Sequence, residues 1–529
     1  MKFSKLTLAA VITAASVFGT VGTAIFAADP TEDATITVNK ALSGTYNVYQ
    51  LFTGTFTADG NMGDITVNPA YKDDIVKAIQ HFDTSFTLDT TATEVSQSNT
   101  LANKITSLCN GENTKEGRAF ANYLAGIITA NPTTTADAAD GTVTVSNMTT
   151  GYYLISAAAA NTTAKTSAIL IPAKSGTNQV DLKATQPVAT KTAVENGATG
   201  AGATSVDQEI SNGKILPPTY TIQGTVASNI ADYSTYPYSI IDTLPKGVVT
   251  TTDEVSKDWN VTITATNGST TTPLTTDATT TVSTDGNVIT WSFTDLKALL
   301  TAANITDADL PSTTVTVTYT PVYDDADLKA LYGTDFSLDT PFTNVAQLKF
   351  ASDPYEGGNG TTTPTDPAAP GSQVKAYSYN LKITKQDADT KPVTGSTFQI
   401  TDADGNVIGN NITASDDGTF NFTGLKSGVE YTLTETAVPA GYEKINPITF
   451  TIAETKDASG AISGITVTKG SDPSNAGAFV TDGATVNATI VNTAGPIMPG
   501  TGQAGMLLAG GAGVAVIAIS AIAAARKKK

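Results

Sequence analysis

Residues 313–320 have the sequence Thr-Thr-Val-Thr-Val-Thr-Tyr-Thr, in which apolar side chains alternate with threonine. Successive side chains of a strand point to opposite faces, so this period of two predicts a β-strand with one buried face. Similar runs occur at 34–38, 141–145, 261–264 and 398–401, separated by glycine, asparagine, aspartate and proline. Short strands with such punctuation are typical of sandwiches. The sequence therefore predicts a mainly β protein of tandem immunoglobulin-like β-sandwich domains.

The first residues have the pattern of a secretory signal. Two lysines precede an apolar stretch at 6–15, and small residues follow around Ala27. The apolar stretch is too short for a stable membrane span, which favours a removable signal peptide at 1–27. Ala24 and Ala28 are alternative cleavage positions.

The last residues have the pattern of a membrane anchor. Residues 506–525 are apolar or small and uncharged, and 526–529 are Arg-Lys-Lys-Lys. Twenty residues at about 1.5 Å each span roughly 30 Å, the thickness of a bilayer's hydrocarbon core. The basic end would stay on the cytoplasmic side. We therefore expect a secreted chain that is held at the membrane by a C-terminal transmembrane helix.

The part between these ends is long enough for several domains. It has about 474 residues if it runs from 28 to 501, which is too many for one hydrophobic core, and three domains are the natural number. We place them at 28–184, 187–355 and 374–495. The segment 356–373 between the last two is rich in glycine, threonine and proline, the composition of a linker.

Helical periodicity interrupts the strand pattern in two of these domains. Apolar residues recur at helical spacing in 72–82 and 115–129 of the first domain. A shorter helical stretch is expected at 295–303 of the second domain. The first domain should therefore carry helical insertions.

The overall composition excludes several classes of function. The formal net charge is −19, and it becomes about −25 without the two ends, because they hold six basic residues and no acidic ones. Such a surface repels nucleic acid. A single cysteine and a single histidine allow no intramolecular disulfide and make a Cys/His zinc site or a Ser-His-Asp triad unexpected. We expect no cofactor, no metal and no nucleic-acid partner.

The five residues before the apolar tail form a recognisable motif. Met498-Pro499-Gly500-Thr501-Gly502 resembles the cell-wall sorting signal of Gram-positive surface proteins, Leu-Pro-any-Thr-Gly, with Met498 in the place of leucine. The resemblance implies that a sortase cleaves between Thr501 and Gly502 and transfers Thr501 to an amine. The alternative is an ordinary membrane anchor, in which the four residues after Met498 are a flexible hinge.

The third domain resembles a known module along its whole length. Its segments 381–387, 398–400, 424–425, 431–442 and 488–492 are similar to the Cna-B-type domain of Gram-positive adhesins and pilins. In that family a lysine of the first strand and an asparagine of the last strand form an isopeptide bond beside a glutamate. The resemblance assigns these roles to Lys385, Asn492 and Glu435, respectively.

The chemistry explains why these three residue types are needed together. A lysine amine attacks an amide only when it is uncharged, so its pKa must fall through burial. Glu435 must be protonated to polarise the carbonyl of Asn492 and to shuttle protons to the departing ammonia. The alternative is a buried salt bridge between Lys385 and Glu435 with the asparagine as a hydrogen-bonding neighbour.

The second domain has a more diffuse version of the same order. Lys191 lies near its start, Asp242 in its middle and Asn344 near its end, as in the Cna-A-like middle domain of major pilins. The resemblance implies a second bond, between Lys191 and Asn344, with Asp242 as the acid. The alternative is that the segment 242–245 only begins a turn.

A polymer subunit also needs a lysine that receives the threonine of the next copy. Major pilins carry it on the last strand of their first domain, where Lys183 matches by position. The residues around it depart from the usual Tyr-Pro-Lys-Asn, so Lys174 is the fallback. A lysine on an exposed strand is otherwise only a solvated charge.

The resemblances together imply a major pilin, the structural backbone subunit of a sortase-assembled pilus, in which Thr501 of one copy is joined to Lys183 of the next. It would be a sortase substrate and no enzyme beyond forming its own crosslinks. The implied partners are a class C (pilus) sortase, identical subunits, minor tip and base pilins, and peptidoglycan through a housekeeping sortase. The implied location is the cell surface and cell wall, after transient membrane anchorage.

Two alternatives remain open at this point. The first is a monomeric wall-anchored adhesin whose first domain binds a host ligand. The second is an anchored surface enzyme, which would need a catalytic cluster such as the paired carboxylates of a glycosidase. The sequence shows no recognisable catalytic cluster.

Overall fold

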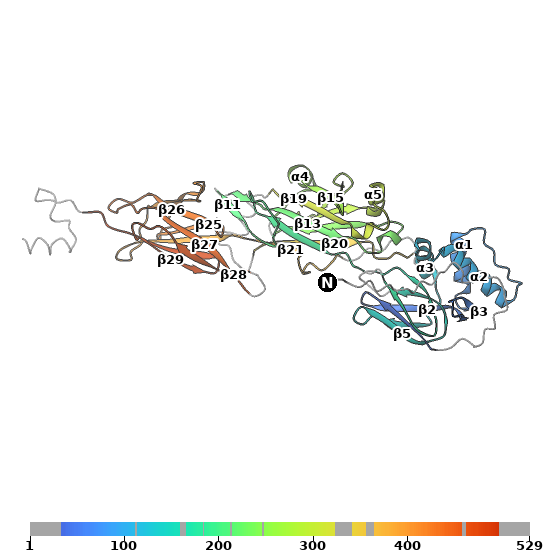
Figure 1. Cartoon of the computed structure of the whole chain (residues 1–529). Helices are drawn as coiled ribbons and strands as arrows, with labels where there is room; N and C mark the ends of the chain where they lie inside the picture. The colour runs from blue at the N-terminus through green and yellow to red at the C-terminus, as the bar shows by residue number, and fades with distance from the viewer. Residues whose placement is uncertain are drawn as a thin grey trace, which may run out of the picture. The chain divides into compact units, whose positions relative to one another are not determined.

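A computed structural model describes residues 33–111, 114–158, 165–182, 185–211, 214–245, 248–322, 341–355, 364–457 and 462–496 (Figure 1). These residues form a mainly β protein, as the alternation predicts. Each of the five strand runs quoted above overlaps an observed strand in sequence. The predicted signal peptide, Lys183, the motif 498–502, the apolar stretch 506–525 and the basic end 526–529 lie outside the described residues. No helix within the described ranges has the length and apolar character needed to cross a membrane.

The contacts divide the chain into two compact units. Among the described residues, the first comprises those up to Val206, 218–322 and 343–375. Within the same described ranges, the second comprises 207–211, 214–217, 341–342 and the residues from Ala376 onward.

The N-terminal part of the first unit contains two sheets, with strand orders β5-β1-β8 and β3-β2-β6-β7, and β4 also pairs with β2. The strands are β1 (Ala34–Asn39), β2 (Thr45–Phe56), β3 (Met62–Val67), β4 (Thr134–Asp137), β5 (Thr142–Met148), β6 (Gly151–Ala157), β7 (Ile169–Ala173) and β8 (Gly176–Asp181). Alternate residues such as Ile36, Val38 and Val48 are buried between the sheets. The first strand, β1, runs parallel to β8, the strand that precedes Lys183.

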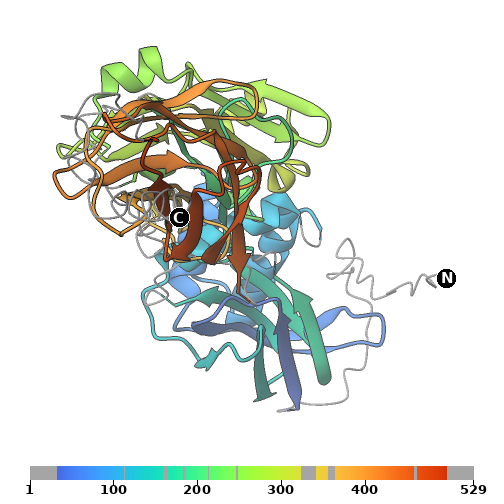
Figure 2. The same ribbon diagram turned by 90° about the vertical axis from the view of Figure 1, so that its left-hand side faces the viewer.

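Three helices are inserted between β3 and β4: α1 (Lys72–Phe82), α2 (Glu94–Cys109) and α3 (Lys115–Ile127). They lie together on one side of these strands (Figures 1 and 2). The helices α1 and α3 confirm the predicted periodicity, whereas α2 was not predicted. Its sequence is mostly polar, and its inner face includes Gln97 and Ser98 as well as Leu101 and Ile105. The hydroxyl of Ser98 accepts a hydrogen bond from the amide of Val67, so packing on β3 compensates for a weak apolar stripe.

The middle part of the chain is a sandwich of a six-stranded sheet, β10-β21-β20-β14-β18-β17, and a five-stranded sheet, β16-β15-β19-β13-β9. The strands are β9 (Ala189–Val194), β10 (Ser205–Asp207), β13 (Thr219–Thr225), β14 (Tyr238–Thr243), β15 (Thr262–Asn267), β16 (Thr270–Pro273), β17 (Thr279–Val282), β18 (Val288–Phe293), β19 (Thr314–Tyr319), β20 (Phe342–Phe350) and β21 (Gln373–Tyr377). Two short helices are α4 (Thr252–Asp258) and α5 (Leu296–Ala302), with 3₁₀ turns at Ile230–Asp232 and Leu310–Ser312. Helix α5 was predicted, and its N-cap Asp295 accepts a hydrogen bond from the amide of Ala298.

The described part of the segment predicted as a linker, 364–373, is hydrogen-bonded to the middle sandwich. The amide of Thr365 donates to the carbonyl of Leu348 at 2.9 Å, and the carbonyl of Gly371 accepts from the amide of Lys191 at 2.6 Å. The chain then enters β21, and only Ser378 separates β21 from β22. A composition rich in glycine, threonine and proline indicates irregular backbone, but it does not tell whether that backbone is bonded to a neighbouring strand.

The second unit is built around another sandwich, called the third sandwich below, with strand orders β25-β22-β30-β29 and β24-β23-β26-β27-β28. The strands are β22 (Tyr379–Asp387), β23 (Thr397–Thr401), β24 (Val407–Thr413), β25 (Thr419–Leu425), β26 (Glu430–Ala437), β27 (Ile448–Lys456), β28 (Ile462–Lys469), β29 (Gly477–Asp482) and β30 (Thr485–Asn492). A hairpin, β11 (Glu209–Ser211) and β12 (Lys214–Leu216), belongs to the same unit. The first strand, β22, pairs in parallel with the last strand, β30.

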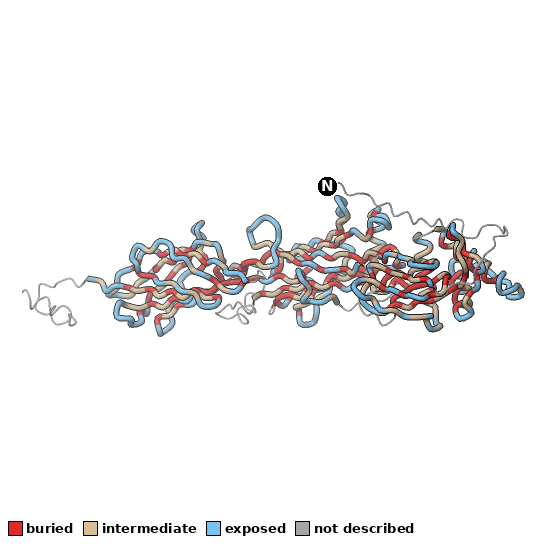
Figure 3. The backbone as a smooth tube through the Cα atoms, turned by 60° about the horizontal axis from the view of Figure 1, so that its bottom comes forward, coloured by how far each residue is buried: buried red, intermediate tan, exposed pale blue. Residues whose placement is uncertain are grey.

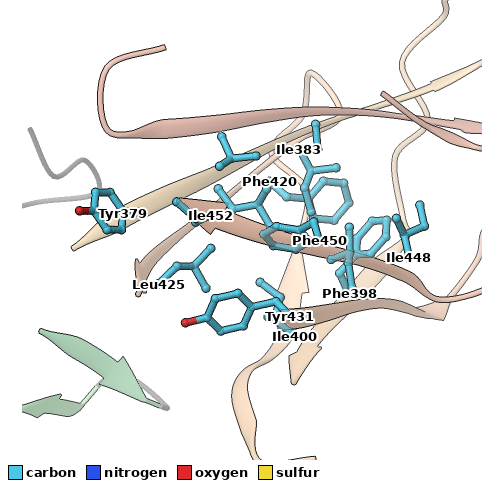
Figure 4. Packing of buried hydrophobic residues seen from close by; sticks show 14 of the residues in the cluster. Tyr379, Ile383, Phe398, Ile400, Phe420, Leu425, Tyr431, Ile448, Phe450 and Ile452 are labelled. Carbon is cyan, nitrogen blue, oxygen red and sulfur yellow. The ribbon is translucent and has the colours of Figure 1, made fainter. Parts of the chain in front are cut away.

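Side chains from both sheets fill the space between them. Figure 4 shows Ile383 of β22, Phe398 and Ile400 of β23, and Phe450 of β27 meeting in this core. Figure 3 shows how buried and more exposed residues follow one another along the strands. Along β30, Val486, Ala488, Ile490 and Asn492 are buried and the residues between them are not. Every second residue of a core strand is therefore removed from water, whether it is apolar or polar.

Tyr355 connects two segments of the first unit that are far apart in the sequence. Its buried hydroxyl accepts a hydrogen bond from the amide of Ala157 and donates one to the carbonyl of Thr166, both at 2.9 Å. Beside it, Lys165 and Asp353 form an ion pair at 2.7 Å. The segment after β20 is thus fastened to the end of β6.

We predict that Tyr355→Phe weakens this connection by about 1–3 kcal/mol, because a buried amide and a buried carbonyl lose their partner. Hydrogen exchange of the Ala157 amide should accelerate roughly 5- to 150-fold. Tyr123→Phe is the matched control, since the half-buried ring of Tyr123 stacks on His81 and should keep that contact. Unchanged exchange at Ala157 in Tyr355→Phe would contradict the prediction.

Candidate functional site

The middle sandwich encloses a polar cluster made of Lys191, Asp242, Asn344 and Tyr319. The Lys191 ammonium forms an ion pair and hydrogen bond with Asp242 Oδ1, and it donates to the Tyr319 hydroxyl at 3.1 Å. The same hydroxyl donates to Asp242 Oδ2 and accepts from Asn344 Nδ2 at 2.7 Å. None of these four side chains is more than 1% exposed. The three residues named from the sequence are therefore brought together, with a tyrosine at their centre.

Strand periodicity explains how these groups meet. Lys191 on β9 and Tyr319 on β19 belong to the five-stranded sheet, and both strands pair with β13. Asp242 on β14 and Asn344 on β20 belong to the opposite sheet. Since Asp242 pairs with Ala346, Asn344 lies diagonally across from it on the same inner face. The cluster therefore spans the two sheets.

Burial controls the protonation of Lys191. It lowers the pKa of this lysine to about 8, and the negative charge and hydrogen bond of Asp242 only partly oppose that change. The ammonium nitrogen lies 5.0 Å from the ring centre of Tyr220 and 5.4 Å from that of Tyr319. An aromatic wall therefore replaces water around an amine that is close to losing its proton.

The third sandwich encloses a second cluster, made of Lys385, Glu435 and Asn492. Lys385 Nζ is 3.8 Å from Glu435 Oε1. Asn492 Nδ2 donates to both oxygens of Glu435, at 3.3 and 3.4 Å, and to the carbonyl of Glu443 at 3.0 Å. Lys385, Glu435 and Asn492 are fully buried.

The register of the first and last strands places this cluster. In the parallel pair of β22 and β30, Lys385 pairs with Ile490 and Asp387 with Asn492. Lys385 and Asn492 thus lie two positions apart on adjacent strands of one sheet, and Glu435 reaches them from β26 of the other sheet. Burial lowers the pKa of Lys385 to about 8, and the charge of Glu435 opposes part of that shift.

Both clusters contain polar atoms without a hydrogen-bond partner among the residues that the structure describes. They are Lys385 Nζ, Asn492 Oδ1 and Asn344 Oδ1. A buried polar atom without a partner destabilises a fold by about 1–3 kcal/mol, and more when it is charged. An uncharged lysine amine is less costly to bury than an ammonium, and it is also the form that can attack an amide.

Two members of the clusters were not found from the sequence. Tyr319 is one, and Ser396 is the other, because its hydroxyl donates to Glu435 Oε1 at 3.0 Å. The alternation in 313–320 already indicated that Tyr319 is on a buried face, where a tyrosine hydroxyl needs a partner. Ser396 precedes β23 and had no comparable signal.

The fallback acceptor, Lys174, follows β7 and lines a cavity of about 700 Å³ in the first unit. Apolar residues of β2, α2 and β7, among them Phe56, Ile105 and Ile171, form much of its wall. The ammonium of Lys174 is 5.9 Å from the ring centre of Phe56. No group of three or more histidine, cysteine, aspartate or glutamate side chains in the described ranges is placed to hold a metal ion.

Comparisons with known proteins agree with this architecture. A family profile described as the SpaA prealbumin-like fold domain matches residues 379–464. The T6 backbone pilin of serotype M6 Streptococcus pyogenes, a modular three-domain structure, is similar with a TM-score of 0.50 and 14% identity over 88% of this chain and 99% of that chain. The fold is that of a backbone pilin. The major pilin SpaA of Corynebacterium diphtheriae has a TM-score of 0.44 and 16% identity over 87% of this chain and 100% of that chain. No curated protein matches the sequence.

The pKa of Lys385 leads to a prediction of how stability changes with pH. It applies to Asn492→Ala, a variant in which Lys385 has no asparagine to react with. The lysine binds its proton more weakly in the folded state, at about 8, than at the ordinary 10.5. Between these values the unfolded state binds more protons, so the free energy of unfolding rises with pH. We expect a rise of at most about 1.4 kcal/mol per pH unit between pH 8 and 10.

Urea-dependent proteolysis of the third sandwich at each pH measures this free energy. The matched control adds Lys385→Met and Glu435→Gln to Asn492→Ala, which removes both ionisable groups of the cluster and cancels the titration of tyrosines elsewhere. The same pH dependence in both variants would show that Lys385 is not the group that titrates.

Proposed function

We propose that this chain is the structural backbone subunit of a covalently polymerised pilus on the surface of a Gram-positive cell. The observation that carries the proposal is the pair of buried lysine–acid–asparagine clusters, each at the core of a sandwich, within a fold similar to that of the T6 backbone pilin. The proposed domains are 28–184, 187–355 and 374–495, flanked by the signal peptide, the sorting motif and the membrane anchor predicted above.

Each cluster would form one isopeptide bond, Lys191 with Asn344 and Lys385 with Asn492. Proton transfer from the lysine to Asp242 or Glu435 gives an uncharged amine and a carboxylic acid. The amine then attacks the asparagine carbonyl, and ammonia leaves. Folding supplies the proximity of the reacting groups.

The proposed bonds suit a subunit under tension. They connect β9 with β20 in the middle sandwich and the first strand with the last strand, β22 with β30, in the third sandwich. By the chain-entropy model, closing such loops stabilises each sandwich by roughly 5 kcal/mol. In addition, a force applied along the chain passes through the crosslink, so the enclosed strands cannot extend.

Polymerisation would use the C-terminal motif. A class C sortase would cleave between Thr501 and Gly502 and join Thr501 to Lys183 of the next copy. Such a head-to-tail contact does not close on itself and gives a filament. A housekeeping sortase would attach the fibre to peptidoglycan, and minor pilins would occupy its tip and base.

The crosslinks are tested by the intact mass of the chain expressed without a sortase. The expected mass is lower than the calculated one by two molecules of ammonia. Asn344→Ala and Asn492→Ala should each reduce this deficit to one molecule of ammonia, and the double variant should have its full calculated mass. A full calculated mass for the unmutated chain would rule out both bonds.

Polymerisation is tested by cell-wall extracts boiled in detergent. We expect a ladder of high-mass species that Lys183→Ala reduces to the monomer and that the matched control Lys174→Ala leaves intact. Collapse with Lys174→Ala alone would move the acceptor to the cavity-lining lysine. A single band for the unmutated protein would refute the pilus and favour a monomeric anchored adhesin.

A further inference from the structure

The hydroxyl of Tyr319 contacts all three groups of the middle cluster that take part in the proposed reaction. It accepts from Lys191 Nζ at 3.1 Å and from Asn344 Nδ2 at 2.7 Å, and it donates to Asp242 Oδ2. It therefore touches the attacking nitrogen, the nitrogen that must leave and the acid.

In the third sandwich the acid contacts the leaving nitrogen without a tyrosine between them. There the acid reaches the leaving nitrogen itself, because Asn492 Nδ2 donates to both oxygens of Glu435. In the middle sandwich the hydrogen bonds from the asparagine nitrogen to the acid run through Tyr319. Aspartate is one methylene shorter than glutamate, and the tyrosine hydroxyl occupies the intervening position.

The surroundings of Tyr319 hold its hydroxyl in place and protonated. Its ring lies 5.5 Å from that of Tyr220, 5.6 Å from Trp259 and 5.7 Å from Trp291, measured between ring centres. Burial, helped by the charge of Asp242, raises the pKa of Tyr319 well above its ordinary value. A fixed, neutral hydroxyl can take a proton on its oxygen while giving up its own.

We propose that Tyr319 is a catalytic residue that relays protons between Lys191, Asp242 and Asn344 while the isopeptide bond forms. The inference rests on the proposed crosslink and names a group that this crosslink requires. The third sandwich needs no such relay, because Asn492 Nδ2 contacts Glu435 directly.

The first relay prepares the amine. The Lys191 ammonium gives a proton to the Tyr319 oxygen, and Tyr319 gives its own proton to Asp242 Oδ2. Lysine is then an uncharged amine and aspartate is a carboxylic acid, with Oδ1 still free to accept. The nitrogen lone pair forms the bond to Asn344 Cγ, and the carbonyl π electrons move to Oδ1 of the asparagine.

The second relay releases ammonia. The new ammonium nitrogen gives a proton to Asp242 Oδ1, the proton on Oδ2 returns to the Tyr319 oxygen, and the tyrosine proton passes to the leaving nitrogen. The bond between Cγ and Nδ2 breaks as the carbonyl re-forms, and one ammonia departs. The tyrosine ends as it began, and the aspartic acid holds the one proton that Lys191 first gave up.

The test compares the two crosslinks in the same molecule. The full chain and its Tyr319→Phe variant are made by cell-free translation without a sortase, stopped at intervals and digested. Mass spectrometry then quantifies the crosslinked peptides of each sandwich. We expect Tyr319→Phe to slow the bond between Lys191 and Asn344 roughly 100-fold or more, and to leave the bond between Lys385 and Asn492 at its normal rate.

Tyr238→Phe is the matched control, since it removes another buried tyrosine hydroxyl of the middle sandwich, one that donates to the carbonyl of Thr225, and it should leave both rates unchanged. An equal rate for Tyr319→Phe and the unmutated chain at the Lys191 bond would overturn the relay. Absence of either crosslink in the unmutated chain would instead overturn the proposed function, so the two failures are distinguishable.

A folding defect is separated from loss of the relay by a second comparison. Asn344→Ala cannot form the middle bond, and adding Tyr319→Phe to it removes only the hydroxyl. Equal resistance of these two variants to proteolysis supports the relay, because the hydroxyl is then dispensable for folding. If the middle sandwich of the double variant is digested while that of Asn344→Ala survives, the role of Tyr319 is structural and the relay is rejected.

Discussion

The structure depends on ionisable side chains that its two sandwiches remove from water. A buried ammonium or carboxylate strongly destabilises a fold unless it is paired or loses its charge. Lys191 and Lys385 meet that constraint in both ways, because each faces an acid and each has a lowered pKa. Burial disfavours the charged form of each lysine, and the uncharged amine that it favours is the nucleophilic form. Stability and chemistry therefore have one physical origin here.

The two clusters reach a similar arrangement by different routes. In the third sandwich, Lys385 and Asn492 are on adjacent parallel strands of one sheet, and the acid comes from the opposite sheet. In the middle sandwich, Lys191 is on one sheet, and Asp242 and Asn344 are on the other. The shorter acid is accompanied by a tyrosine, and the longer one by the hydroxyl of Ser396. What the clusters share is a buried lysine, an acid and an asparagine, whereas the sheet geometry and the hydrogen bonds that join these groups differ.

Local sequence patterns predicted much of the fold, and their failures have identifiable causes. The alternation around Val315 and Val317 and the helical spacing of 72–82 were sufficient because each element buries one regular apolar face. Helix α2 was missed because polar residues such as Gln97 occupy part of its inner face. Helix α4 was also missed, although Thr251 and Glu254 form a capping box, a signal that is readable from their spacing of three residues.

The sequence by itself determined the strand alternation, and with it which polar residues must be buried. Lys385, Glu435 and Asn492 occupy inward positions in segments that resemble a known module, so they could be named before their contacts were seen. Only the tertiary structure decided that the hydroxyl of Tyr319 hydrogen-bonds both Asp242 and Asn344. It also decided that the segment 364–373 is hydrogen-bonded to the middle sandwich. The physical reason is that side-chain periodicity is a property of one strand, whereas the hydrogen bonds of Tyr319 depend on how three strands of two sheets, β19, β14 and β20, are placed against one another.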